Sequence, residues 1–153
     1  MTKLPTLILA GLLSTSAFSQ DATPAMQTAE AVLDLRVAAD LNPDDFLWLN
    51  RLIVVFADSD RDPSYQEQLK LLTGRFAPLL AERDVIVITD TDPANPSDIR
   101  KKLRPRGFGL VLIDKDGVIK LRKPSPWDVR EISRSIDKTD LRQQEMRDAR
   151  GEQ

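Results

Sequence analysis

Two continuously apolar runs on either side of an amphipathic segment constrain this chain more than any other feature. Residues 52–57 and 85–89 are rich in β-branched side chains and show no polar alternation, which predicts strands covered on both faces. Between them, Pro63 begins a segment whose apolar residues recur every three or four positions as far as Leu80, which predicts one helix of about four to five turns. A strand, a helix and a second strand form a right-handed βαβ unit with parallel strands.

The second half of the chain predicts a β-hairpin. Residues 110–113 and 118–121 are apolar runs joined by the turn Asp114-Lys115-Asp116-Gly117. An Asp-Gly pair between two such runs is a strong hairpin signal, because glycine adopts a positive φ without steric cost. We therefore expect the two runs to pair as antiparallel strands of the same sheet.

Shorter helices complete the predicted order of elements. Ser97 is expected to cap a helix that ends near Leu103, and Ser125, followed by Pro126, to cap a last amphipathic helix. Residues 31–41 fit either a strand or a short helix. The resulting order, β-α-β-α-β-β-α, predicts an α/β fold with a thioredoxin-like mixed sheet flanked by helices.

Several short motifs carry a resemblance to a known family. They are Leu49-x-Arg51, Arg106-Gly107-Phe108-Gly109, the turn Asp114-Lys115-Asp116-Gly117, Lys120-Leu121-Arg122, and Ile136-Asp137 followed by Arg142-x-x-Glu145. Together, over about residues 41–146, they resemble the DUDES domain, a thioredoxin-like family of unknown function in exported bacterial proteins and in some animal secreted matrix proteins. The resemblance implies the fold and the compartment. It implies no activity, because the family offers no catalytic residues to transfer.

The chain contains no cysteine and no histidine. A thioredoxin carries Cys-x-x-Cys in the loop after its central strand, where this chain has Asp58-Ser59-Asp60-Arg61-Asp62, and a cis-proline before the hairpin, where this chain has Phe108-Gly109. Thiol redox chemistry is therefore excluded, because no residue can form a thiolate. Gly109 either allows a ligand backbone to approach closely or relieves a bend before the strand.

The two ends of the chain are expected to lie outside the domain. Residues 1–19 have a positive start, an apolar run and small residues at the end, as in a cleaved secretory signal, and the run is too short to span a bilayer. We expect a flexible lead over residues 20–40, the thioredoxin-like domain over 41–137 and a polar C-terminal helix or tail over 138–153. The protein is accordingly expected to be exported, to the periplasm or outside the cell, with no membrane span after cleavage.

The acidic loop after the first predicted strand suggests a cation site. Alternate carboxylates at residues 58, 60 and 62 suit calcium, but Pro63 stands where an EF-hand needs glycine and Leu69 where it needs a bidentate glutamate. A looser site stays open, because the loops after two parallel strands emerge at the same edge of the sheet. The alternative is a solvated acidic edge with turn and capping roles. The candidate ligands are Asp58, Asp60, Asp62, Asp90 and Asp92.

A phosphatase of the haloacid-dehalogenase type is a further alternative. Residues 54–60 and 111–117 each resemble the strand and Asp-x-Asp that open such enzymes. Only 39 residues follow Asp114, however, and no later strand after Asp58 ends in the paired acids that hold the metal. Turn chemistry explains Asp114 to Gly117 better.

A basic segment follows the acidic half of the chain. Residues 40–98 hold twelve acidic and five basic side chains, whereas residues 99–123 hold nine basic and two acidic. Basic clusters of this kind bind phosphate groups, sulfated glycans or acidic proteins, although a solvated face with cations near a helix C-terminus is the simpler interpretation. The candidate binding residues are Arg100, Lys101, Lys102, Arg104 and Arg106.

The overall charge argues against one class of partner. Without residues 1–19 the chain keeps 21 basic and 24 acidic residues, so we expect no nucleic-acid binding.

Trp48 and Trp127 are expected to be lids on the core, and Arg51, Arg106 and Arg122 to pair with the acidic loops if they are buried. We expect a binding module without cofactor or resident metal, for an anionic glycan or an acidic protein. The alternative is a metal-assisted hydrolase at the acidic edge.

Overall fold

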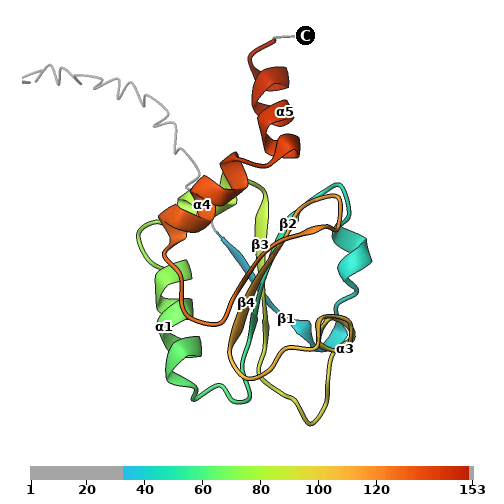
Figure 1. Ribbon diagram of the computed structural model, residues 1–153, viewed down its shortest axis with the longest axis vertical. Coiled ribbons are helices and arrows are strands. Elements are labelled where there is room, and N and C mark those ends of the chain that lie inside the picture. The colour runs from blue at the N-terminus through green and yellow to red at the C-terminus, as the bar shows by residue number, and fades with distance from the viewer. Residues whose placement is uncertain (1–32, 152–153) are drawn as a thin grey trace, which may run out of the picture.

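The computed structural model describes residues 33–151, which form a five-stranded mixed sheet with helices on both faces (Figure 1). The strands are β1 (Asp34–Val37), β2 (Arg51–Phe56), β3 (Val85–Asp90), β4 (Gly109–Ile113) and β5 (Ile119–Lys123). The helices are α1 (Pro63–Leu72), α2 (Ala77–Ala81), α3 (Asp98–Leu103), α4 (Val129–Asp137) and α5 (Asp140–Ala149), and two 3-10 turns are η1 (Ala38–Asp40) and η2 (Pro43–Phe46).

The strand order is β1-β3-β2-β4-β5, with β2 at the centre. β3 runs parallel to both β1 and β2, and β4 is antiparallel to β2 and β5. The parallel neighbours predicted from the two apolar runs and the predicted hairpin are therefore confirmed. All six residues of β2 and all six of β3 are buried, as expected for strands covered on both faces.

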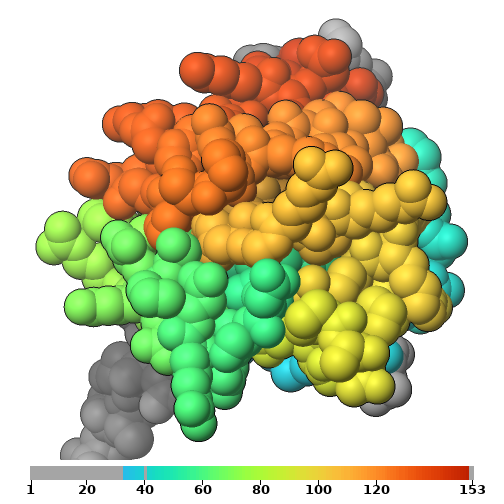
Figure 2. Space-filling view, turned by 60° about the horizontal axis from the view of Figure 1, so that its bottom comes forward, coloured from blue at the N-terminus to red at the C-terminus, as the bar shows by residue number. Residues whose placement is uncertain are grey.

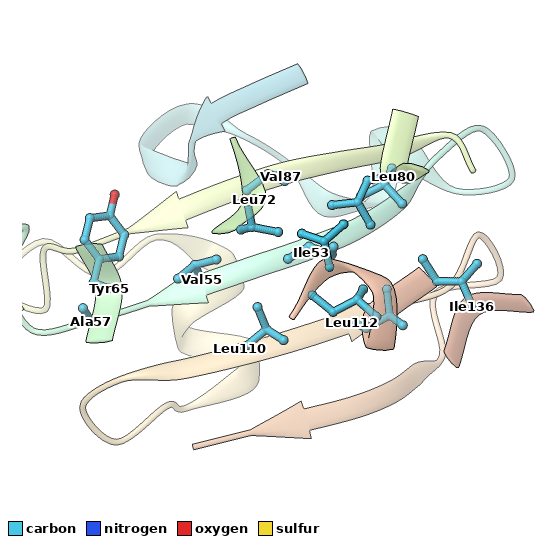
Figure 3. Close-up of a cluster of buried hydrophobic side chains, with 13 residues drawn as sticks. Ile53, Val55, Ala57, Tyr65, Leu72, Leu80, Val87, Leu110, Leu112 and Ile136 are labelled. Atoms are coloured by element: carbon cyan, nitrogen blue, oxygen red, sulfur yellow. The ribbon is translucent and has the colours of Figure 1, made fainter. Parts of the chain in front are cut away.

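Alternate side chains of the central strands enter two separate cores. Ile53 and Val55 point toward α1, α2 and α4, where Leu72, Leu80 and Ile136 meet them (Figure 3). Within residues 33–151, the opposite core, built on Leu52, Val54 and Phe56, is covered by the short helix α3 and the turns η1 and η2. The second face thus has a thinner cover than the first.

The expected long helix from Pro63 to Leu80 is wrong, because the chain breaks it after Leu72. Pro78 has no N–H, and its ring would collide with the carbonyl of Gly74 in a continuous helix. Thr73 ends α1, and its hydroxyl donates a hydrogen bond of 2.8 Å to the carbonyl of Leu69. The chain then restarts as α2, with Pro78 in its first turn.

The last core helix begins later than expected. Asp128, not Ser125, caps α4 by accepting a hydrogen bond of 2.8 Å from the backbone N–H of Arg130. The reason lies in α1, where the buried Gln68 accepts from the N–H of Trp127 at 2.7 Å and donates to its carbonyl at 3.1 Å. These two bonds occupy the backbone of Trp127 and hold it outside the helix.

Both ends of the ordered domain extend past the expected boundaries. Of the segment 31–41, the described residues form a strand and a 3-10 turn in succession, since β1 pairs with β3 and η1 follows it, so the sheet includes residues before residue 41. At the other end, the expected polar helix is α5. The expected signal over residues 1–19 and most of the lead lie outside the described residues. Within residues 33–151, no helix combines the length and apolar character needed to cross a membrane.

We predict that Gly117→Val lowers the free energy of unfolding by about 1–2 kcal/mol or more. Gly117 has φ +79°, and a Cβ there would lie 3.0 Å from Cδ2 of Leu47. Valine would therefore meet both backbone strain and a collision. Denaturant melts measure the difference.

The matched control is Val118→Ala, at the exposed next position, which should change the midpoint little. Lys115 is unsuitable as a control, because its amine is paired with Asp84 at 2.7 Å and Glu145 at 2.9 Å. Equal midpoints for the two variants would show that a left-handed glycine is not what closes this turn.

Candidate functional site

The candidate site is the edge of the sheet where the parallel strands β2 and β3 end. The loop after β2, the loop between β3 and α3, and the segment before β4 lie at this edge. Figure 2 looks onto it, with the start of α1 (green) beside the region of α3 (yellow). Four of the five aspartates named as metal candidates lie in or next to the two loops, and Asp90 ends β3.

A buried arginine occupies this edge. The side chain of Arg100, in the first turn of α3, is 8% exposed, and its Nε lies 2.8 Å from Oδ1 of Asp90. Its Nη2 donates to the carbonyls of Ala57 at 2.7 Å and of Asp90 at 2.8 Å. Arg100 therefore joins the ends of β2 and β3, and its expected place on an exposed basic surface is wrong.

The carboxylate of Asp90 is fully engaged. It accepts hydrogen bonds from Arg100 and from the hydroxyl of Ser97, which in turn accepts from the N–H of Arg100 at 3.1 Å and so caps α3. The Arg100 guanidinium also lies over the ring of Phe56, 5.4 Å from its centroid. Ser97, Asp90 and Arg100 form a closed polar cluster that offers neither a free nucleophile nor a free base.

The other candidate ligands serve local structure. Asp62 caps α1 by accepting from the N–H groups of Ser64 at 2.8 Å and Tyr65 at 3.1 Å. Asp92 accepts from Asn95, and the side-chain hydrogen bond of Asn95 is the main cause that lowers the pKa of Asp92. These are the turn and capping roles of the simpler interpretation.

The remaining two aspartates do not complete a cation site. Asp58 is exposed, and its nearest cation is Nη1 of Arg100 at 3.9 Å, while Asp60 accepts from the hydroxyl of Ser59 at 3.3 Å. Within the described part of the chain, no three acidic side chains converge as metal ligands would. The geometry does not assemble the acidic edge on which a metal-assisted hydrolase would depend.

The bend before β4 is made at Gly107, not at Gly109. Gly107 has φ +63°, and a Cβ there would lie 3.9 Å from Oδ2 of Asp58. A Cβ at Gly109 would meet nothing within 4 Å, so neither a bend nor a close contact within the domain requires glycine at that position.

An exposed basic surface remains after Arg100 is removed from it. Arg104 ends α3 in a left-handed conformation with φ +48°, and its backbone N–H donates to the carbonyl of Arg100 at 2.8 Å. Arg122, on β5, donates to the carbonyl of Leu103 at 3.2 Å and so adjoins the end of the helix. We call this the basic surface; its members are Lys101, Lys102, Arg104, Arg106 and Arg122.

The three arginines of the basic surface carry unneutralised charge. Lys101 pairs with Asp98 at 2.9 Å and Lys102 with Asp44 at 3.9 Å, both at exposed positions. Among the side chains that the structure describes, which do not include that of Asp40, no carboxylate lies within 4 Å of the guanidinium groups of the three arginines, so the expected pairing of Arg106 and Arg122 with acidic loops is not observed there. Their charges are available to a partner.

A second ionic cluster closes the opposite end of the sheet. The side chain of Arg51, at the start of β2, is 1% exposed; its Nη2 lies 3.1 Å from Oε1 of Glu145, and its Nη1 donates to the carbonyl of Arg83 at 3.0 Å. Its Nε lies 2.8 Å from Oδ1 of Asp114, although the N–H is not aimed at that oxygen. Arg51 is thus paired as its sequence position suggested, but with the hairpin turn and α5.

Glu145 has an unusually acidic side chain. Burial raises the pKa of Glu145, but hydrogen bonds from Lys115, Arg51 and Arg142 outweigh it and lower the pKa to about 2. The distances are 2.9 Å to Nζ of Lys115 and 3.0 Å to Nη1 of Arg142. Because no side chain of α5 is fully buried, these ionic contacts are its main attachment to the sheet.

The two tryptophans differ. Trp127 packs partly buried against the larger core, with Nζ of Lys123 lying 4.3 Å from its ring centroid, as expected for a lid. Trp48 is 68% exposed, so its expected role as a lid is wrong. No local pattern distinguished the two, because exposure depends on which tertiary neighbour covers each ring.

The family described as "Domain of unknown function (DUF4174)" matches residues 42–145. Coiled-coil domain-containing protein 80 of Danio rerio is 33% identical in an alignment 130 positions long that covers 66% of this chain, and the chain spans only 15% of that protein's length.

Two solved structures are similar in fold. A reduced 2-Cys peroxiredoxin of Plasmodium vivax is 16% identical with a TM-score of 0.52, over 69% of this chain and 85% of that one. A thioredoxin from Thermus thermophilus is 18% identical with a TM-score of 0.47, over 68% and 84%. With the strand order, the peroxiredoxin match confirms the predicted α/β, thioredoxin-like fold.

We predict that Arg100→Gln lowers the free energy of unfolding by about 3–5 kcal/mol, because it leaves the Asp90 carboxylate buried without its cation. Lys101→Gln, the next residue along α3, removes the same charge from an exposed side chain and should cost at most about 1 kcal/mol. Urea melts of the two variants provide the comparison. Similar losses would mean that Arg100 does not join the strand ends as described.

A further prediction concerns Glu145 and pH. Since the pKa of Glu145 is near 2 in the folded protein and 4.5 is its ordinary value, its contribution to stability is fully present above about pH 4.5 and is lost as pH falls toward 2. Glu145→Gln should therefore be less stable than the wild type at pH 7, and the difference should shrink as the pH decreases. Glu67→Gln, at an exposed position on α1, is the control. A constant difference from pH 7 to 2 would contradict the ionic role of Glu145.

Proposed function

The chain belongs to the DUF4174 family of domains of unknown function, and from that membership and the geometry we propose that it works by binding an anionic partner, not by catalysis. The observation that carries the proposal is the basic surface, where three exposed arginines have no carboxylate partner among the described side chains, in a region that follows a strongly acidic half of the chain. Such a concentration of uncompensated positive charge attracts anionic groups.

The loop where thioredoxins carry their redox thiols also supports a function in binding. A thioredoxin-like fold normally places its thiols after the central strand, and this chain has no cysteine to place there. The space beside that loop is filled by the closed cluster of Arg100, Asp90 and Ser97. The fold is therefore used as a scaffold, and its exposed surfaces carry the function.

The partner class follows from the charge of the surface. An anionic glycan and an acidic protein both present the negative groups that lysine and arginine bind. Nucleic acid is not proposed, because acidic residues exceed basic ones in the chain as a whole. A metal-assisted hydrolase is not carried further, since Asp62, Asp90 and Asp92 already have structural partners.

Export and the narrower family name are part of the proposal. Residues 1–19 have the composition of a secretory signal, so we propose that the protein acts in the periplasm or outside the cell. The DUDES name rests on the motifs around Arg51, the hairpin turn and Glu145. It is supported by the match to an animal protein, of which the chain spans a small part.

We predict that the protein is retained on immobilised heparin at low salt, and that retention decreases steeply as the Debye length shortens from about 30 Å at 0.01 M to about 8 Å at 0.15 M. Replacing Lys102, Arg104 and Arg106 by glutamine should abolish retention. The melting temperature should stay within about 2 °C, because exposed charges contribute little to stability. Arg100 is left intact, since it is buried.

The matched control makes the same change in charge elsewhere. Lys70, Arg75 and Lys138 are exposed on the helical side of the molecule, and their replacement by glutamine should leave retention unchanged. If both triple variants are retained like the wild type, or if the wild type is not retained at low salt, the basic surface is only a solvated face.

A further inference from the structure

An exposed apolar patch lies at the end of the sheet where the hairpin joins β4 to β5. It is formed by the loop before β2 and the tip of the hairpin, which contact one another (Figure 1). The backbone N–H of Trp48 donates to the carbonyl of Lys115 at 2.7 Å, and a Cβ at Gly117 would lie 3.0 Å from Leu47. We call this the apolar patch; its members, between 38% and 68% exposed, are Leu47, Trp48, Leu49, Val118 and Ile119.

The backbone conformation of Trp48 is energetically unfavourable. Its φ is +64°, in the left-handed region that a bulky side chain rarely adopts. The ring gains no compensating burial, because it is 68% exposed. Strained backbone conformations that persist without a packing reward are concentrated at sites that contact ligands and partners.

A pocket connects the apolar patch with the basic surface. Phe46, Leu52 and Ile113 line it together with Ile119 of the patch and Lys102 of the basic surface, and its volume is about 50 Å³. One water molecule needs roughly 10–15 Å³ by the same kind of measure, so the pocket has room for part of an apolar side chain.

The basic surface continues directly from this pocket. Leu103 lines the pocket, and its carbonyl accepts from Arg122. Nζ of Lys102 lies 3.9 Å from Oδ1 of Asp44 in η2, and both residues line the pocket. Apolar and positive groups thus adjoin on the thinly covered face of the sheet.

We propose that the anionic partner is an acidic polypeptide segment that carries an apolar or aromatic anchor, and that the anchor packs against Trp48 and the pocket while its acidic residues face the basic surface. This inference rests on the proposed function and narrows it. A sulfated glycan supplies the charge but has no apolar side chain to bury against the patch. Tryptophan and arginine are among the residues that most often dominate protein-protein contacts.

A second copy of the chain fits the apolar patch less well than an acidic polypeptide segment does. A two-fold contact through this patch would bring the two basic surfaces near one another, and like charges across an interface oppose association. An acidic segment has the complementary charge.

The test compares two labelled polymers of equal length, polyglutamate and a random glutamate–tyrosine copolymer, by fluorescence anisotropy at low salt. We expect the copolymer to bind the wild type at least about tenfold more tightly than polyglutamate. Trp48→Asn should remove this difference and leave the affinity for polyglutamate unchanged. Asparagine tolerates a left-handed backbone, so the variant should fold and melt no lower than the wild type.

Two control variants separate the possible outcomes. Val37→Asn changes an equally exposed apolar residue on β1, at the opposite edge of the sheet, and should alter neither affinity. The glutamine variant of Lys102, Arg104 and Arg106 should lose both polymers. Together the controls assign the charge dependence to the basic surface and the aromatic preference to the patch.

Each contrary outcome is distinct. Equal affinities of the wild type for the two polymers, a preference that survives Trp48→Asn, or binding of heparin but of neither polypeptide would overturn the inference and leave the proposed function standing. Binding of no anionic probe at all would overturn both. Dimerisation that disappears in Trp48→Asn would assign the patch to a second copy and also overturn the inference.

Discussion

The buried ion pair between Arg100 and Asp90 determines what the functional edge of this fold can do. The guanidinium of Arg100 donates hydrogen bonds to the carbonyls of Ala57, just after β2, and of Asp90, at the end of β3, which would otherwise face an open edge. The guanidinium also fills the space beside the loop that carries thiols in thioredoxins. Its partner Asp90 is also buried, so removal of either residue alone would leave the other charge buried and unpaired, at a cost of about 3–5 kcal/mol. Function at this end has to come from side chains farther out, and Lys101 and Lys102, which follow Arg100 in the same helix, are exposed members of the basic surface.

A second buried arginine performs the corresponding task at the other end of the central strand. Arg51 joins the start of β2 to the hairpin turn through Asp114 and to α5 through Glu145. A chain without disulfides thus holds both ends of β2 by ionic contacts while apolar packing fills the middle. Buried ion pairs contribute little net stability compared with apolar replacements, but they penalise any arrangement that separates the partners. In this domain the buried ion pairs therefore mainly determine which strand ends and which turn lie together.

The elements that could be predicted from the sequence are those that local chemistry dictates. The two β-branched runs and the Asp-Gly turn needed no tertiary information, and neither did the cap at Ser97. Pro78 also indicated a break in the helix, but the three- and four-residue spacing of the apolar side chains around it favoured one continuous helix. By contrast, Arg100 stands in a run of five basic residues, and its burial depends on Asp90 and on the carbonyl of Ala57, which the fold brings to it. The exposure of Trp48 likewise depends on a turn, η2, that covers the core and leaves the neighbouring ring outside.

The attachment of α5 has a consequence for how the domain opens. A helix of ten residues is too short to be stable by itself in water, and none of its side chains is fully buried, so its helical structure exists only while Glu145 remains bound to its cations. Docking and helix formation are then one cooperative event, and the C-terminal segment is a separate unit in the hierarchy of local unfolding. Release of α5, which contributes no strand to the sheet, would uncover Arg51 and leave it with Asp114 of the hairpin turn as its anion. The same turn supports the apolar patch through the carbonyl of Lys115, so the state of the C-terminus and that of the proposed binding face share one structural element.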